Sequence, residues 1–129
     1  VVVGHSSGAV CCMRLMETTK IGAAVLVSTC YTDLGDENER ASGYFSREWD
    51  WGAMRRNCPQ IHQFHSDDDH LIPVKEARFV ARSLKGGGGE EFTSLTAGVD
   101  EGFTYQELAG HGHFFSMFPE VLDVVVKCL

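Results

Sequence analysis

The chain has 129 residues and a mass of 14.2 kDa, and its 43% hydrophobic and 22% charged residues are typical of one folded domain rather than a disordered chain. Its net charge of −7 argues against binding to nucleic acid or to a membrane surface. The five cysteines are an odd number without C-x-x-C spacing, and no apolar run reaches the about 18–20 residues of a membrane helix. We therefore expect reduced thiols, no metal, no cofactor and a cytoplasmic location.

The first 27 residues predict a strand, a turn, a helix and a second strand. Residues 1–3 are β-branched and typical of a strand buried on both faces. The small residues of the turn 4–8 lead into a segment whose apolar residues recur at helical spacing as far as Met16. The apolar run 23–27 is the next strand. Such a unit implies a parallel sheet with a crossover helix.

The middle of the chain adds a loop, a helix and a third strand. Residues 29–45 are polar and acidic and predict a long loop, a kind of segment that is often functional. Residues 48–57 predict a short helix, which Pro59 ends, and residues 61–64 predict a strand.

The last third predicts two helices and one more strand. After Pro73, apolar residues follow the i, i+3, i+4, i+7 pattern of an amphipathic helix, and residues 86–89 form a glycine break. Residues 103–105 predict a fourth strand. Pro119 suits the start of a final helix, although 124–126 would also suit a strand. That helix is expected to turn three side chains inward: Val121, Leu122 and Val125. The whole pattern predicts one α/β domain over 1–129, a three-layer sandwich with a mostly parallel sheet.

The turn after the first strand has the sequence G-x-S-x-G, with Ser6 at its centre. Placed between a strand and a helix, this pattern is the nucleophile elbow, in which glycines permit a sharp turn that exposes the serine hydroxyl. The N–H groups at the start of the following helix would stabilise a developing oxyanion, and Ser7 supplies the first of them. The alternative is a plain turn with Ser6 or Ser7 capping the helix.

The order of the later polar residues favours the catalytic interpretation. A serine nucleophile needs a base, and the base needs a carboxylate that orients it. Hydrolases of the α/β class supply these in the order serine, acid, histidine, from the carboxyl ends of successive strands. Here the acidic run 67–69 follows the third strand, and two histidines, His111 and His113, follow the fourth.

Within each cluster one residue is preferred. Asp69 begins a D-x-x-[VIL]-P stretch, which favours it over Asp67 and Asp68, both of which could instead cap the next helix. His113 precedes a phenylalanine in a G-H-F sequence and is the preferred base, with His111 as the alternative.

Several blocks of the chain resemble the small serine hydrolases of the retinoblastoma-binding protein nine family. They are residues 1–9, the acidic loop 31–45, the triplet 57–59 and the triplet 112–114. The acidic loop is a long string and therefore much more selective than G-x-S-x-G. The resemblance implies a flavodoxin-like variant of the α/β-hydrolase sheet.

Carried over residue by residue, the resemblance implies Ser6 as nucleophile, Asp69 as acid and His113 as base, acting on small-molecule esters or amides. It also implies that four aromatic residues lie near the pocket mouth, with core and loop packing as their alternative: Tyr44, Phe45, Trp49 and Trp51.

The chain departs from the family in several places. The family has further residues before Val1, including the glycine-rich loop that gives the second oxyanion donor, so the chain is expected to match the carboxyl-terminal two-thirds of the family domain. His65 and His70 replace a glycine and a proline of the relatives, and the glycines 86–89 are inserted. The chain has no L-x-C-x-E segment, so binding to retinoblastoma protein is not expected.

Two other interpretations remain open. Histidines 62, 65 and 70 could bind a metal together with the acidic run 67–69, but residues three apart on a strand point to opposite faces. Alternatively, the chain is a non-catalytic interaction domain, or an inactive fragment that keeps the triad without turnover.

Overall fold

The computed structural model describes residues 1–86, 102–116 and 118–129. Its elements, in chain order, are β1 (Val2–His5), α1 (Ser7–Thr18), β2 (Ala23–Val27), α2 (Glu37–Ala41), α3 (Trp51–Asn57), β3 (Gln60–Ser66), α4 (Val74–Lys85), β4 (Phe103–Leu108) and α5 (Pro119–Cys128). The four predicted strands are present, and residues 124–126 belong to a helix. Gly86 ends α4 in a left-handed conformation, and the rest of the glycine break lies outside the described residues.

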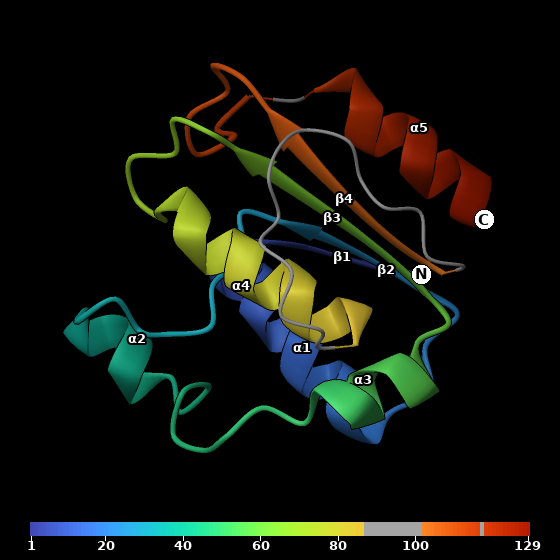
Figure 1. The fold of residues 1–129 in the computed structure, drawn as a ribbon, viewed down its shortest axis with the longest axis horizontal. Helices are drawn as coiled ribbons and strands as arrows, with labels where there is room; N and C mark the ends of the chain where they lie inside the picture. Colours follow the sequence, from blue (N-terminus) through green and yellow to red (C-terminus); the bar gives the residue numbers. More distant parts are fainter. Residues whose placement is uncertain (87–101, 117) are drawn as a thin grey trace.

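The four strands form one parallel sheet in the order β1-β2-β3-β4. Helices α1, α3 and α4 cover one face of it and α5 covers the other, so the fold is the expected three-layer sandwich (Figure 1). Because all strands are parallel, their carboxyl ends lie along one edge, and the turns that follow β1, β3 and β4 meet there.

Two hydrophobic clusters hold the layers together. The larger one lies between the sheet and the helices α1, α3 and α4, and its buried members include Met13, Met54 and Leu84. The smaller one joins β2, β3 and α5 through Val25, Phe64 and the partly buried valines of that helix. Burial of this apolar surface supplies the main driving force for folding.

Three expectations about these elements were wrong in detail. Val3 is 53% exposed rather than buried on both faces, because β1 is an edge strand and the cluster beneath α5 does not extend over it. Leu122 is 54% exposed, because α5 packs through Val121 and Val125 together with Val124. The loop 29–45 contains the helix α2, which buries no residue and so leaves no apolar period in the sequence.

Candidate active site

Ser6 sits at a sharp turn between β1 and α1. Its backbone has φ 56° and ψ −124°, a strained conformation for a residue with a side chain, and its N–H donates to the carbonyl of Val27 at 2.9 Å. Gly4 makes the turn possible, because a Cβ there would lie 2.6 Å from the nitrogen of Ala9 and closer still to the oxygen of Gly8. The turn has the form expected of a nucleophile elbow.

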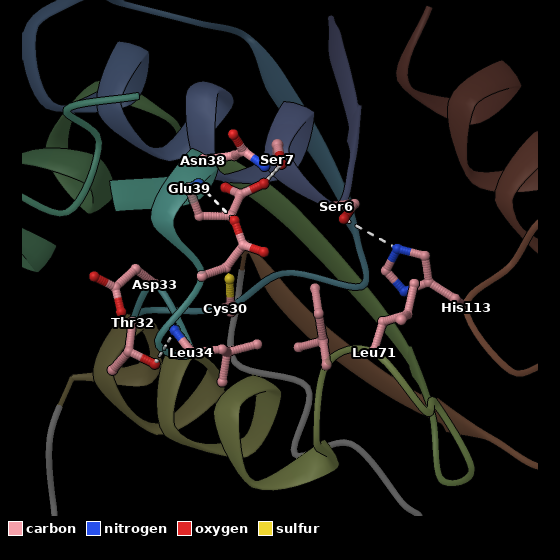
Figure 2. A pocket seen from close by; sticks show the side chains of 12 residues that line it. Ser6, Ser7, Cys30, Thr32, Asp33, Leu34, Asn38, Glu39, Leu71 and His113 are labelled. Carbon is pink, nitrogen blue, oxygen red and sulfur yellow. Dashed lines mark hydrogen bonds between the residues drawn. The ribbon is translucent and has the colours of Figure 1, made fainter. Parts of the chain in front are cut away.

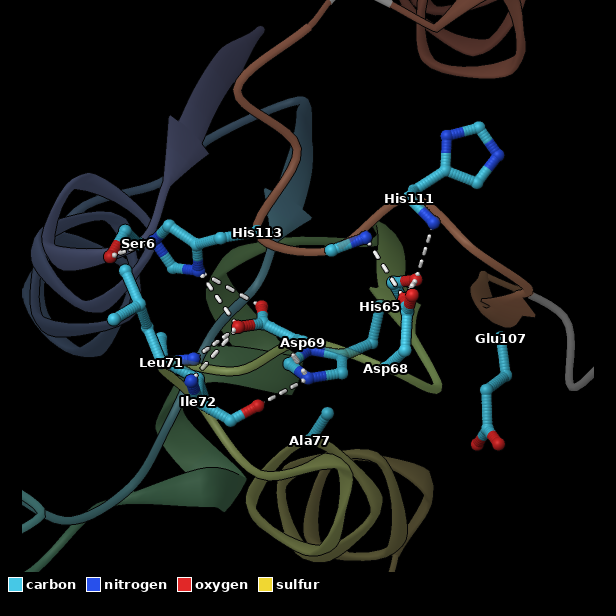
Figure 3. Close-up of polar contacts among 12 residues, drawn as sticks. Ser6, His65, Asp68, Asp69, Leu71, Ile72, Ala77, Glu107, His111 and His113 are labelled. Atoms are coloured by element: carbon cyan, nitrogen blue, oxygen red, sulfur yellow. Dashed lines mark hydrogen bonds and ion pairs between the residues drawn. The ribbon is translucent and has the colours of Figure 1, made fainter.

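Three side chains meet at the carboxyl edge of the sheet. Ser6 Oγ lies 3.0 Å from His113 Nε2, although the two residues are 107 positions apart in the sequence (Figure 2). His113 Nδ1 lies 2.9 Å from Asp69 Oδ2 and 3.1 Å from Oδ1 (Figure 3). The carboxylate can only accept, so Nδ1 carries the proton and Nε2 is free to accept the proton of the serine. The structure therefore brings all three predicted residues into hydrogen-bond contact.

The Asp69 carboxylate is buried and firmly held. Burial alone would raise its pKa, but hydrogen bonds from the backbone N–H of Ile72, from His113 and from the N–H of Leu71 outweigh burial and lower the pKa below its usual range. Asp69 Oδ1 accepts from these two N–H groups at 2.9 and 3.0 Å. An ionised carboxylate in this position orients the imidazole and stabilises its charged form.

The alternatives Asp68 and His111 hold the loop that carries His113. Asp68 Oδ1 accepts from Ser66 Oγ at 2.6 Å and from the N–H of Gly112 at 2.9 Å, and these two bonds lower the pKa of Asp68. The N–H of His111 donates to Ser66 Oγ, while its ring stacks on Phe114. Neither side chain forms a hydrogen bond with Ser6 or His113.

Two further contacts at the site were not predicted. Asp67 Oδ1 accepts from the N–H of Gly110 at 3.3 Å, so all three carboxylates of the acidic run are used. His5, the variable residue of the elbow, has its Nε2 2.6 Å from the carbonyl oxygen of His113, and the two rings are 4.7 Å apart. The only sequence signal for the His5 contact was its place in the G-x-S-x-G turn, next to Ser6.

A cavity of about 450 Å³ opens beside Ser6 and His113 (Figure 2). This volume lies within the range of small-molecule sites, about 300–1,000 Å³. Its wall comes from the elbow, from the loop with α2 and from the turn after β3. The twelve lining residues are Ser6, Ser7, Cys30, Thr32, Asp33, Leu34, Asp36, Asn38, Glu39, Leu71, Ile72 and His113.

The acidic loop forms one side of this cavity. Asp36 caps α2 by accepting from the N–H of Glu39 at 2.9 Å, and Glu39 accepts a hydrogen bond from Ser7 Oγ. Ser7 is the first residue of α1, so its backbone N–H has no acceptor within the helix. That N–H is the candidate oxyanion donor.

The four aromatic residues expected at the pocket mouth are not among the lining residues. Tyr44, Phe45 and Trp49 pack against a small buried cluster, and Trp51 packs against the main core. Arg14 contacts two of them: its guanidinium stacks 3.5 Å from the Trp49 ring, and its Nε donates to the carbonyl of Tyr44. Packing thus accounts for their positions.

The proposed metal ligands are dispersed. His62 Nδ1 contacts Thr104 Oγ1 at 2.8 Å on one face of the sheet, whereas His65 Nε2 contacts the carbonyl of Ile72 at 2.9 Å on the other. Among the residues that the structure describes, no group of three or more His, Cys, Asp or Glu side chains could hold a metal ion. Nor does any described helix have the length and apolarity needed to cross a bilayer.

No protein-family profile matches the chain. Serine hydrolase RBBP9 of Rattus norvegicus is 55% identical to it over 84 residues, which are 65% of this chain and 45% of that protein. The chain therefore spans less than half the length of this relative.

Among solved structures, the ydeN gene product of B. subtilis superposes with a TM-score of 0.73 at 19% identity, over 98% of this chain and 63% of that one. At this identity the match concerns the fold alone. Together with the parallel sheet and its flanking helices, this match shows an α/β-hydrolase-like fold, and 84 residues of the chain are similar in sequence to a serine hydrolase.

Proposed function

We propose that the chain is a serine hydrolase that cleaves ester or amide bonds of small substrates. The observation that carries the proposal is the unbroken chain of hydrogen bonds from Ser6 Oγ through His113 to Asp69. Similarity to a serine hydrolase supports it.

In this proposal Ser6 Oγ attacks the substrate carbonyl carbon while His113 Nε2 takes the hydroxyl proton. The N–H of Ser7 donates to the resulting oxyanion. The tetrahedral intermediate then collapses, the bond to the leaving group breaks, and His113 returns the proton to the leaving oxygen or nitrogen.

Water completes the cycle. His113 removes a proton from the water as it attacks the acyl-enzyme, and passes that proton back to Ser6 when the acid leaves. Asp69 keeps the imidazole in the tautomer that both steps need. The net reaction adds one water across the ester or amide bond and requires no cofactor.

A fluorophosphonate probe tests the proposal directly. The wild-type chain should be labelled and Ser6→Ala should not, while Ser83→Ala, on α4 and outside the cavity lining, is the control and keeps labelling. His113→Ala should lose hydrolysis of a panel of acyl esters and aminoacyl amides by about 10⁴-fold or more. His111→Ala is the control for that loss.

Labelling that persists in Ser6→Ala contradicts the proposal. A folded wild-type chain that neither labels nor hydrolyses any ester of the panel would favour the non-catalytic interaction domain or inactive fragment instead.

A further inference from the structure

His65 is a fully buried histidine directly beside the proposed catalytic acid (Figure 3). It lies on β3, four residues before Asp69, and its Nε2 is 3.9 Å from Asp69 Oδ2, too far for a hydrogen bond. Its partner is instead the backbone carbonyl of Ile72, at 2.9 Å. The mechanism proposed above assigns this side chain no role.

The contact with Ile72 fixes the protonation of the ring. A carbonyl oxygen only accepts, so Nε2 of His65 must carry the proton and donate it. Nδ1 then presents a lone pair, and it has no hydrogen-bond partner among the described residues. Burial lowers the pKa of His65, so the ring is neutral near pH 7. Only one of its two nitrogens is used, and that nitrogen holds a backbone carbonyl.

Ile72 connects this bond to the triad. Its N–H donates to Asp69 Oδ1 at 2.9 Å, while its carbonyl accepts from His65. The backbone of one residue is thus fixed on one side by the catalytic carboxylate and on the other by a side chain of β3. Since Ile72 is itself buried, water cannot replace either bond.

We propose that His65 is a positioning residue of the active site: by donating its Nε2–H to the Ile72 carbonyl it fixes the turn 69–72 and so holds the Asp69 carboxylate against His113 Nδ1. This inference rests on the proposed function, because it assigns to His65 the support of the catalytic acid. His65 does not line the cavity itself, and it makes no contact with Ser6; it reaches the site through Ile72, which is one of the lining residues.

Substitutions at position 65 separate the donor from the volume of the ring. Glutamine places an amide N–H at about the reach of Nε2, asparagine is too short to do so, and leucine fills space without a donor. His62→Gln and His62→Leu are matched controls, since His62 lies on the same strand but faces away from the triad.

Two measurements report on the positioning role. We expect His65→Leu and His65→Asn to lower the rate of fluorophosphonate labelling and kcat for an ester by about 10–10²-fold with little change in KM, at temperatures where each variant is fully folded. We expect His65→Gln to keep most of both rates. The low-field proton NMR signal of the Nδ1–H of His113 should be lost or shifted upfield in the first two variants and retained in the third, and it does not depend on turnover.

The inference is overturned if His65→Leu and His65→Asn match wild type in labelling rate and NMR signal, or if His65→Gln falls as far as they do. If His65→Leu does not fold, the glutamine and asparagine pair decides alone. A wild-type chain that is never labelled refutes the proposed function, and the low-field signal then still tests whether His65 holds the Asp69–His113 contact.

Discussion

The strained backbone at Ser6 predicts that the proposed nucleophile is held at a cost in stability. With φ 56° and ψ −124°, any residue carrying a Cβ is disfavoured there by about 1–3 kcal/mol. Ser6→Ala and Ser6→Gly both remove Oγ and its bond to His113, but only glycine relieves the strain. Because glycine has more conformational freedom in the unfolded chain, this stabilisation is reduced by about 0.4–1 kcal/mol. We therefore expect Ser6→Gly to be more stable than Ser6→Ala by about 0.5–2 kcal/mol.

Thermal unfolding measures this difference. For 129 residues the entropy of unfolding is about 0.27 kcal/mol/K, so Tm of Ser6→Gly should exceed that of Ser6→Ala by about 2–7 °C. Ser7→Ala and Ser7→Gly are the matched pair. Ser7 lies at the start of α1 without a positive φ, so glycine there should be the less stable of the two. A Ser6→Gly protein that melts at or below the Tm of Ser6→Ala would refute the claim of strain at the elbow.

Two further predictions follow from shifted pKa values. The pKa of Asp69 is lower in the folded than in the unfolded chain, so its contribution to stability is present above about pH 4 and is lost as pH falls through the folded value. The difference in free energy of unfolding between wild type and Asp69→Asn, measured with urea, should therefore decrease as the pH falls from about 6 to about 3. A difference that stays constant or increases would contradict this. Burial, and then the negative charges of Glu76 and Glu39, raise the pKa of Cys30 to about 12. Iodoacetamide should therefore alkylate the exposed Cys11 well before Cys30 in the native protein, which peptide mass spectrometry would detect. Equal rates of alkylation would contradict the raised pKa of Cys30.

Local sequence was enough to place the strands and the elbow. The apolar run 23–27 coincides with β2, and the G-x-S-x-G turn lies between β1 and α1 as expected. These features depend on neighbouring residues alone: apolar runs favour strands, and Gly4 permits the close approach of β1 to the start of α1. The fold class followed from the order of such elements.

Features that depend on distant contacts were harder to predict. The choice of Asp69 over Asp68 rested on a short pattern, whereas the structure separates the two by what each carboxylate accepts. The aromatic residues near Trp49 were expected at the pocket mouth. Trp49 instead stacks on the guanidinium of Arg14, a residue 35 positions earlier, and local sequence patterns do not reveal such a distant contact. Helix α2 was missed because it buries nothing, and yet it forms part of the cavity wall.

The position of β4 at the border of the described sheet has a consequence for how catalysis would fail on heating. This strand pairs with β3 on one side, and the loop after it carries His113. Border strands separate at lower free energy than central ones, and β1, which leads to Ser6, lies at the opposite border. Detachment of either strand breaks the contact between Ser6 and His113 while β2 and β3 stay paired. Such a molecule keeps most of its helical signal in circular dichroism, so inactivation should precede the spectroscopic melt, and the interval between the two curves would measure how firmly the border strands are attached.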